Sequence, residues 1–159
     1  MENEKVKVIS MVEGRIGVNS AELRFARQWL QKGSTVSIDR QTLEELMYDN
    51  GFRYMIESGM LYIEDMEVKK DLGLEPEDAT QPENIIVLTD KQMRHYMVTM
   101  PLAEFKERVA DLKYEQILIL ADFAIKNRLG DFDKTNHIKK ICGKDILRAI
   151  QLNELDKED

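Results

Sequence analysis

The stretch that says most about the fold is KVKVISMVEGRIGV, residues 5–18. Polar and β-branched apolar side chains alternate along it, and a period of two is typical of strands with one buried face. Glu13-Gly14 interrupts this pattern and predicts a turn. From Thr89 onward, apolar residues recur at helical spacing instead. We therefore expect an α+β fold, with short strands in a small mixed N-terminal part and a helical C-terminal bundle.

The C-terminal half carries the clearest helix signals. Thr89 is a good N-cap, and Pro101 stands where the first residue of the following helix is expected. Residues 114–127, YEQILILADFAIKN, are apolar on more than one side and predict the most buried helix. Two further helices are expected after it, with Gly143 ending the first of them.

The expected organisation is two parts joined by an acidic connection. Residues 1–88 form the mixed α+β part and residues 89–153 the helical part, with a disordered tail at residues 154–159. Residues 75–84, EPEDATQPEN, contain two of the three prolines and almost no apolar side chain. They predict a linker or protruding loop between the two parts.

Residues 20–33 are ambiguous. As a helix, this segment is capped by Ser20 and ended by Gly33. As a strand, it shows the alternation Leu23, Phe25, Arg27, Trp29. We favour the helix because no turn chemistry interrupts the segment earlier.

The middle of the chain predicts short elements. Residues 40–51 are expected to form a helix, with Asp39 as its N-cap and Asn50-Gly51 closing it. Residues 60–63 predict a strand, residues 64–74 a short acidic helix or turn, and residues 85–88 another strand.

Composition excludes several classes of protein. The net charge of −7 argues against a chain that binds DNA or membranes by its overall charge. A single cysteine excludes an internal disulfide framework and fits a reducing compartment. The first residues, MENEK, contain no secretory signal pattern, and the apolar runs are too short to cross a bilayer.

The negative charge is concentrated in one segment. Residues 41–83 carry 12 acidic and 3 basic side chains, whereas residues 84–159 carry 13 of each. Residues 1–40 have 7 basic and 5 acidic side chains. The acidic middle is therefore suited to a basic partner and poorly suited to phosphate.

No pattern of catalytic residues is evident. His95, His137 and Cys142 are isolated, and we expect neither an enzyme activity nor a metal or cofactor site. Gly143-Lys144 lacks the other residues of a phosphate-binding loop, and a glycine that ends a helix is the better interpretation. Asp131 or Asp133 is interpreted as the N-cap of the next helix, since the other ligands of a calcium loop are missing.

Glu44-Glu45 and Glu64-Asp65 could in principle act as acid–base pairs. Neighbouring positions on a helix do not face each other, however, so a solvated acidic face is the preferred interpretation for both pairs.

Two features could bind partners. Trp29, with Arg24, Arg27 and Lys32, combines the residue types most often found as interface anchors, although a lone Trp more often belongs to the core. A basic cluster near the C-terminus could contact nucleic acid, although it lacks interleaved aromatic residues. Within it we single out Lys134, Lys139, Lys140, Lys144 and Arg148.

Four segments of the sequence resemble small uncharacterised proteins of tailed bacteriophages. They are residues 59–66, 72–90, 100–109 and 143–153. This resemblance contains no defining motif and transfers no catalytic residue. It implies a virion or accessory protein at the capsid, neck or tail, or an early host-interaction protein, found in the virion or the host cytoplasm.

We therefore expect a non-enzymatic structural or adaptor protein of a larger assembly. Its partners would be other proteins of that assembly, and also itself as a homo-oligomer. The alternative is a nucleic-acid-associated regulator that uses the basic C-terminal cluster.

Overall fold

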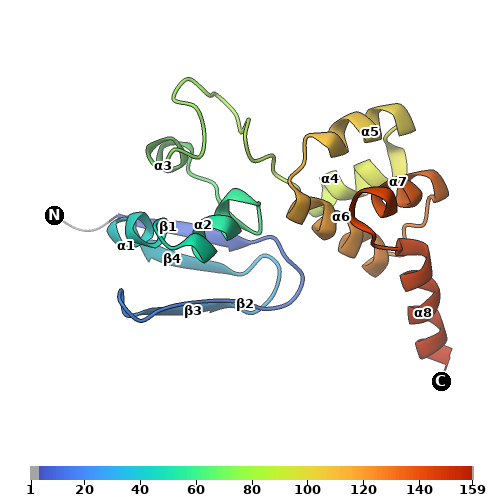
Figure 1. The fold of residues 1–159 in the computed structure, drawn as a ribbon, viewed down its shortest axis with the longest axis horizontal. Helices are drawn as coiled ribbons and strands as arrows, with labels where there is room; N and C mark the ends of the chain where they lie inside the picture. The colour runs from blue at the N-terminus through green and yellow to red at the C-terminus, as the bar shows by residue number, and fades with distance from the viewer. Residues whose placement is uncertain (1–3, 159) are drawn as a thin grey trace. The chain divides into compact units, whose positions relative to one another are not determined.

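The computed structural model describes residues 4–158 and confirms the α+β class, with 49% of the chain helical and 16% in strands. The chain forms two compact units, Met1–Val87 and Leu88–Asp159. The boundary expected from the sequence lies one residue further along. Figure 1 shows the strands and short helices of the first unit and the helices of the second.

The first unit is built around the central strand β1. Its elements are β1 (Lys5–Ser10), β2 (Ile16–Ser20), β3 (Phe25–Trp29), β4 (Thr35–Asp39), α1 (Arg40–Leu46), α2 (Asn50–Glu57), β5 (Leu61–Ile63) and α3 (Met66–Asp71). Antiparallel pairing gives a sheet of order β4-β1-β5, and β2 pairs with β3 in a separate hairpin. Val6 and Val8 are buried whereas Lys5 and Lys7 are exposed, which confirms the predicted alternation.

The helix favoured for residues 20–33 is wrong. This segment contains a turn over residues 21–24 and then strand β3, with Phe25 and Trp29 buried. The turn includes Arg24 at φ 52°, a left-handed conformation that the sequence did not signal. Phe25 and Trp29 are four residues apart, a spacing that places side chains on one face of both a helix and a strand.

The predicted end of the helix over residues 40–51, at Asn50-Gly51, is also wrong. α1 stops at Leu46, and Asn50 begins α2, in which the Asp49 carboxylate accepts a hydrogen bond from the Gly51 amide at 3.4 Å. Asp39 precedes α1 as predicted, but its side chain makes no capping hydrogen bond and pairs with Lys5 instead.

The remaining predictions for this unit have mixed outcomes. Strand β5 and helix α3 confirm the elements expected at residues 60–63 and 64–74. The strand expected at residues 85–88 is not present in the described chain, although Ile85 and Leu88 are both buried.

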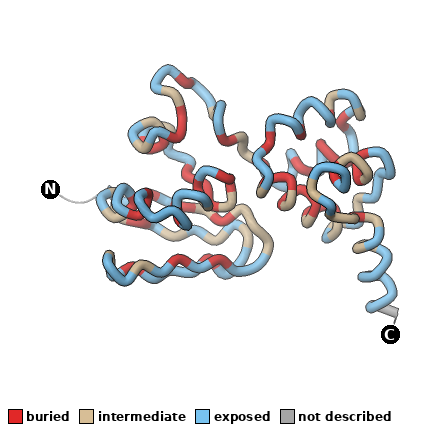
Figure 2. Tube along the Cα trace, viewed as in Figure 1, coloured by how far each residue is buried: buried red, intermediate tan, exposed pale blue. Residues whose placement is uncertain are grey.

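The second unit is helical. Its elements are α4 (Asp90–Arg94), the π-helical turn η1 (His95–Thr99), α5 (Leu102–Ala110), α6 (Tyr114–Lys126), α7 (Phe132–Cys142) and α8 (Ile146–Glu158). Helix α6 is the most buried of them, as predicted, and it contacts α4, α7 and α8. Figure 2 shows the contrast between the buried positions of α6 and the exposed surface of α8.

Capping explains where these helices begin and end. Thr89 and Gln92 form a capping box, in which the Thr89 hydroxyl accepts a hydrogen bond from the backbone N–H of Gln92 at 3.2 Å. Asp131 caps α7, and Gly143 ends it at φ 78°, so these three caps are confirmed. Pro101 is the residue before α5 and not its first residue.

The C-terminal end of the chain differs from its prediction. A disordered tail was expected at residues 154–159, but α8 continues through Glu158, the last residue described.

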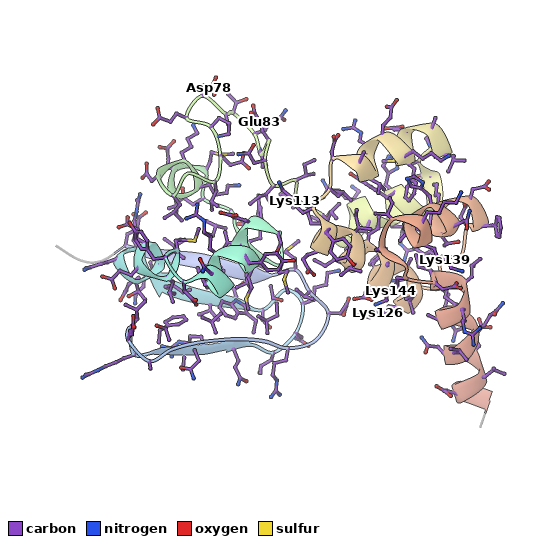
Figure 3. All side chains as sticks on the ribbon, viewed as in Figure 1. Asp78, Glu83, Lys113, Lys126, Lys139 and Lys144 are labelled. Atoms are coloured by element: carbon purple, nitrogen blue, oxygen red, sulfur yellow. The ribbon has the colours of Figure 1, made fainter. Side chains whose placement is uncertain are left out.

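The acidic segment 75–84 is not a free linker, because a buried carboxylate ties its two ends together. Glu75 is 3% exposed and accepts hydrogen bonds from the backbone amides of Glu83, Asn84 and Ile85 at 2.9–3.1 Å. The Asn84 side chain donates to the Leu74 carbonyl at 2.8 Å. Between these points the loop carries Asp78 outward (Figure 3).

The stability that the Glu75 hydrogen bonds give to this loop depends on pH. Burial alone would raise the pKa of Glu75, but the three amide donors and the nearby charge of Lys69 lower it below its ordinary value. A lowered pKa in the folded state contributes stability above the unfolded pKa, about 4.3, and this stability is lost as the pH falls through the folded pKa.

We expect Glu75→Gln to destabilise the first unit at neutral pH by about 1–3 kcal/mol, because an amide cannot accept all three backbone bonds. Chemical unfolding of the wild type and the variant, measured from pH 7 downward, tests this expectation. The difference between them should begin to shrink below about pH 4.3, where the unfolded chain takes up the proton first, and should be lost as the pH falls through the lower pKa of folded Glu75. Glu77→Gln, at an exposed position in the same loop, is the control. If the difference in unfolding free energy between the wild type and Glu75→Gln did not change with pH, this would contradict the role assigned to the Glu75 carboxylate.

Candidate functional site

Trp29, expected as a partner-binding anchor or a core residue, is a core residue. Its side chain is 0% exposed, and its indole N–H donates to the Val8 carbonyl at 2.9 Å. Phe25 is buried on the same face of β3. The bond links the hairpin to the central strand, so Trp29 is not available as an exposed anchor.

The three basic residues predicted to accompany Trp29 lie in different environments. Arg24 and Arg27 are exposed, and the Arg27 guanidinium stacks over the Phe25 ring at 5.8 Å. Lys32 is largely covered, with its Nζ 3.8 Å from a Glu13 carboxylate oxygen. The structure therefore does not gather these residues around an exposed Trp.

The predicted basic cluster is also divided. Lys134 is 4% exposed, and its Nζ lies 5.5 Å from the centre of the Phe105 ring. It is not a surface residue because α7 turns this side chain into the core beside α5. Burial lowers its pKa, an effect that the charge of Asp131 partly opposes.

Two more lysines of the cluster are paired with carboxylates. Lys139 Nζ lies 3.1 Å from Asp145 Oδ2, and Lys144 Nζ lies 2.6 Å from Asp122 Oδ1. Figure 3 labels both lysines, which lie near the connection between α7 and α8. Lys140 and Arg148 remain exposed. The positive charge available to nucleic acid is therefore smaller than the count of basic residues predicts.

The strongest candidate for a binding surface is an acidic groove in the first unit, formed by α1, the start of α2 and the end of α3. Its volume is about 570 Å³. The residues that line the acidic groove are Gln41, Glu44, Glu45, Met47, Tyr48, Arg53, Asp71 and Leu72. Tyr48 is 88% exposed, which is unusual for so large a side chain.

Local structure explains this arrangement. Leu43 and Leu46 turn the apolar face of α1 into the core, which leaves Glu44 and Glu45 on the solvent side. Because α1 ends at Leu46, Tyr48 lies in the turn before α2 and points outside the core. The sequence predicted the acidic face at Glu44-Glu45 but missed Tyr48, since it extended the helix through that position.

Ion pairs neutralise the basic residues next to the groove. Arg40 contacts Glu4 Oε2 at 3.0 Å, Glu44 Oε1 at 3.5 Å and Asp71. The hydrogen bonds that Arg40 donates to these carboxylates, to Glu4 first and then to Asp71, raise its pKa. Arg53 pairs with Glu57 in the same helix. Within the lining, the carboxylates of Glu44, Glu45 and Asp71 outnumber the one cation, Arg53. Arg40 pairs with Glu44 and Asp71, so the acidic groove keeps a small net negative charge beside an exposed aromatic ring.

The isolated residues named from the sequence do not come together. His137 lies against the edge of Phe105, with ring centres 6.1 Å apart, whereas the Cys142 thiol donates to the Ile138 carbonyl at 3.3 Å. His95 Nδ1 contacts the Thr99 hydroxyl within η1. In residues 4–158, no three His, Cys, Asp or Glu side chains are grouped as a metal site would require.

No helix within the described part of the chain combines the length and apolar character needed to cross a bilayer. Comparisons with protein-family models, curated proteins and solved structures find no match to this chain.

The position of Lys134 leads to a prediction about stability. We expect Lys134→Met to leave stability unchanged within about 0.5 kcal/mol or to increase it, because a buried ammonium group is replaced by an apolar side chain of similar length. Thermal unfolding at neutral pH measures the effect, with Lys140→Met at an exposed position of the same helix as the control. A loss of unfolding free energy greater than about 1 kcal/mol for Lys134→Met, without a similar loss for Lys140→Met, would contradict the view that the buried ammonium group of Lys134 does not stabilise the fold.

Proposed function

We propose that this chain is a non-enzymatic structural or adaptor protein of a larger assembly, and that its acidic groove binds a basic segment of another protein in that assembly. The observation that carries the proposal is Tyr48, which is 88% exposed next to the carboxylates of Glu44 and Glu45. Tyrosine is enriched in protein interfaces because its flat ring supplies contact area and its hydroxyl can form hydrogen bonds.

Charge supports the same partner chemistry. Residues 41–83 carry most of the acidic excess of the chain, and the groove lies within this segment. A negative surface attracts a basic segment and speeds the encounter, while Tyr48 can stack against an arginine side chain. A basic partner therefore gains both long-range attraction and a specific contact.

The assembly that we propose is a tailed-bacteriophage particle, with the chain at the capsid, neck or tail, in the virion or in the host cytoplasm. This part of the proposal is supported only by the sequence resemblance to small bacteriophage proteins. Mass spectrometry of purified particles tests it directly, and a complete particle proteome without this chain would reject it.

The proposed binding is tested with a fluorescent arginine-rich peptide and a glutamate-rich peptide of the same length. We expect the full chain to bind the first peptide and not the second, as measured by fluorescence anisotropy. The affinity should fall as salt increases from about 0.01 M to about 0.1 M, because the screening length falls from about 30 Å to about 10 Å.

Variants of the chain test whether the arginine-rich peptide binds at the acidic groove. The double variant Glu45→Lys, Tyr48→Ser should weaken binding at least about tenfold, equal to about 1.4 kcal/mol. Glu22→Lys, an exposed position outside the groove, makes the same change of charge as Glu45→Lys and should have little effect. Equal losses for Glu22→Lys and for the double variant would indicate a general charge effect and would contradict a specific site.

A further inference from the structure

The acidic groove contains one carboxylate that no basic residue of the chain engages. Glu44 and Asp71 both pair with Arg40. Within residues 4–158, the Glu45 side chain has no hydrogen-bond or ion-pair partner, and it lines the groove. A cation that enters the groove therefore meets a free carboxylate at Glu45, whereas it would have to share the other two with Arg40.

The end of α1 places Glu45 beside the exposed ring of Tyr48. The Tyr48 amide donates to the Glu45 carbonyl at 3.1 Å, and Met47 between them keeps a helical backbone at φ −66° and ψ −14°. Side chains three residues apart along such a turn lie on the same side of it. Both residues line the acidic groove, and Tyr48 is 88% exposed. A free carboxylate and the open face of an aromatic ring are therefore neighbours.

The basic residues near the groove do not fill this position themselves. Arg53, which lines the groove, pairs with Glu57 one turn further along α2. Arg40 pairs with Glu4, Glu44 and Asp71. In the described part of the chain, neither guanidinium forms an ion pair with Glu45. The position beside Tyr48 is therefore open to a cation from another molecule.

We propose that Glu45 and Tyr48 together recognise one arginine side chain of the basic segment, in preference to lysine. This inference rests on the proposed function of the acidic groove, and it identifies the side chain that anchors the partner. The guanidinium group lies with its flat face on the Tyr48 ring and donates hydrogen bonds from its edge to the Glu45 carboxylate.

The shape of the guanidinium group accounts for the preference. It is planar and weakly hydrated, so it can cover an aromatic face while its N–H groups point outward in its own plane. A lysine ammonium is a compact, strongly hydrated charge that cannot cover the ring and also present two parallel donors to a carboxylate. Both side chains carry the same charge, so long-range attraction does not distinguish them. The distinction arises at the Tyr48 ring.

Two labelled peptides of equal length and charge, one rich in arginine and one rich in lysine, test the preference by fluorescence anisotropy with the full chain. We expect the arginine peptide to bind at least about fivefold more tightly. Tyr48→Leu should reduce this ratio of dissociation constants to less than about two, because the flat ring is lost. Tyr114→Leu, which removes a 54% exposed tyrosine from the second unit, is the matched control and should leave the ratio unchanged.

The ring itself is tested with Tyr48→Phe, which removes only the hydroxyl. This variant should retain a preference for arginine that Tyr48→Leu lacks, since the aromatic face remains. Circular dichroism checks that each variant is folded. If both variants lost the preference equally, the stacking on Tyr48 would be refuted.

The outcomes separate this inference from the proposed function. Equal affinities for the two peptides, or a preference that survives Tyr48→Leu, would overturn the arginine site and leave the acidic groove as a binding surface for basic segments. Binding of neither peptide would overturn both the arginine site and the proposed function of the groove.

Discussion

The buried side chain of Trp29 joins the β2–β3 hairpin to the rest of the N-terminal unit, because it packs in the shared apolar core and its indole N–H donates to the Val8 carbonyl of the central strand. Trp29 and Val8 are both fully buried, so without the Val8 carbonyl the indole N–H would be an unpaired donor in the core. The same core contains Leu43, Leu46 and Phe52, which position α1 and α2. The acidic groove exists because these apolar faces point inward.

The sequence predicts the fold class correctly because its two halves have different periodicities. Val6 and Val8 alternate with lysines, while residues 114–127 are apolar around much of a helix. The hairpin was missed because no Gly, Pro, Asn or Asp marks the turn at residues 21–24, where Arg24 adopts a left-handed conformation, so helix and strand both remained open and the uninterrupted helix was favoured. Propensity could not decide between them, since the deciding bond, from Trp29 to Val8, joins residues 21 positions apart.

The candidate site was predictable only in part. The acidic middle of the chain is visible in its composition, but the groove depends on where α1 ends, and that end exposes Tyr48. The basic cluster was overestimated because its lysines meet carboxylates that the sequence does not link to them. Lys144 pairs with Asp122, 22 positions earlier, and Lys134 turns into the core. Counting charges along a chain cannot detect such pairing.

The central claim is that the acidic groove is an interface for a basic protein segment. The most direct test places a photoreactive amino acid at position 48 of the full chain, in its native assembly, and identifies the cross-linked peptides by mass spectrometry. The same group at position 30, where Leu30 is 61% exposed, is the control. We predict that position 48 captures lysine- and arginine-rich segments of one protein and that position 30 does not. Recovery of the same peptides from both positions, or of acidic segments from position 48, would contradict the claim.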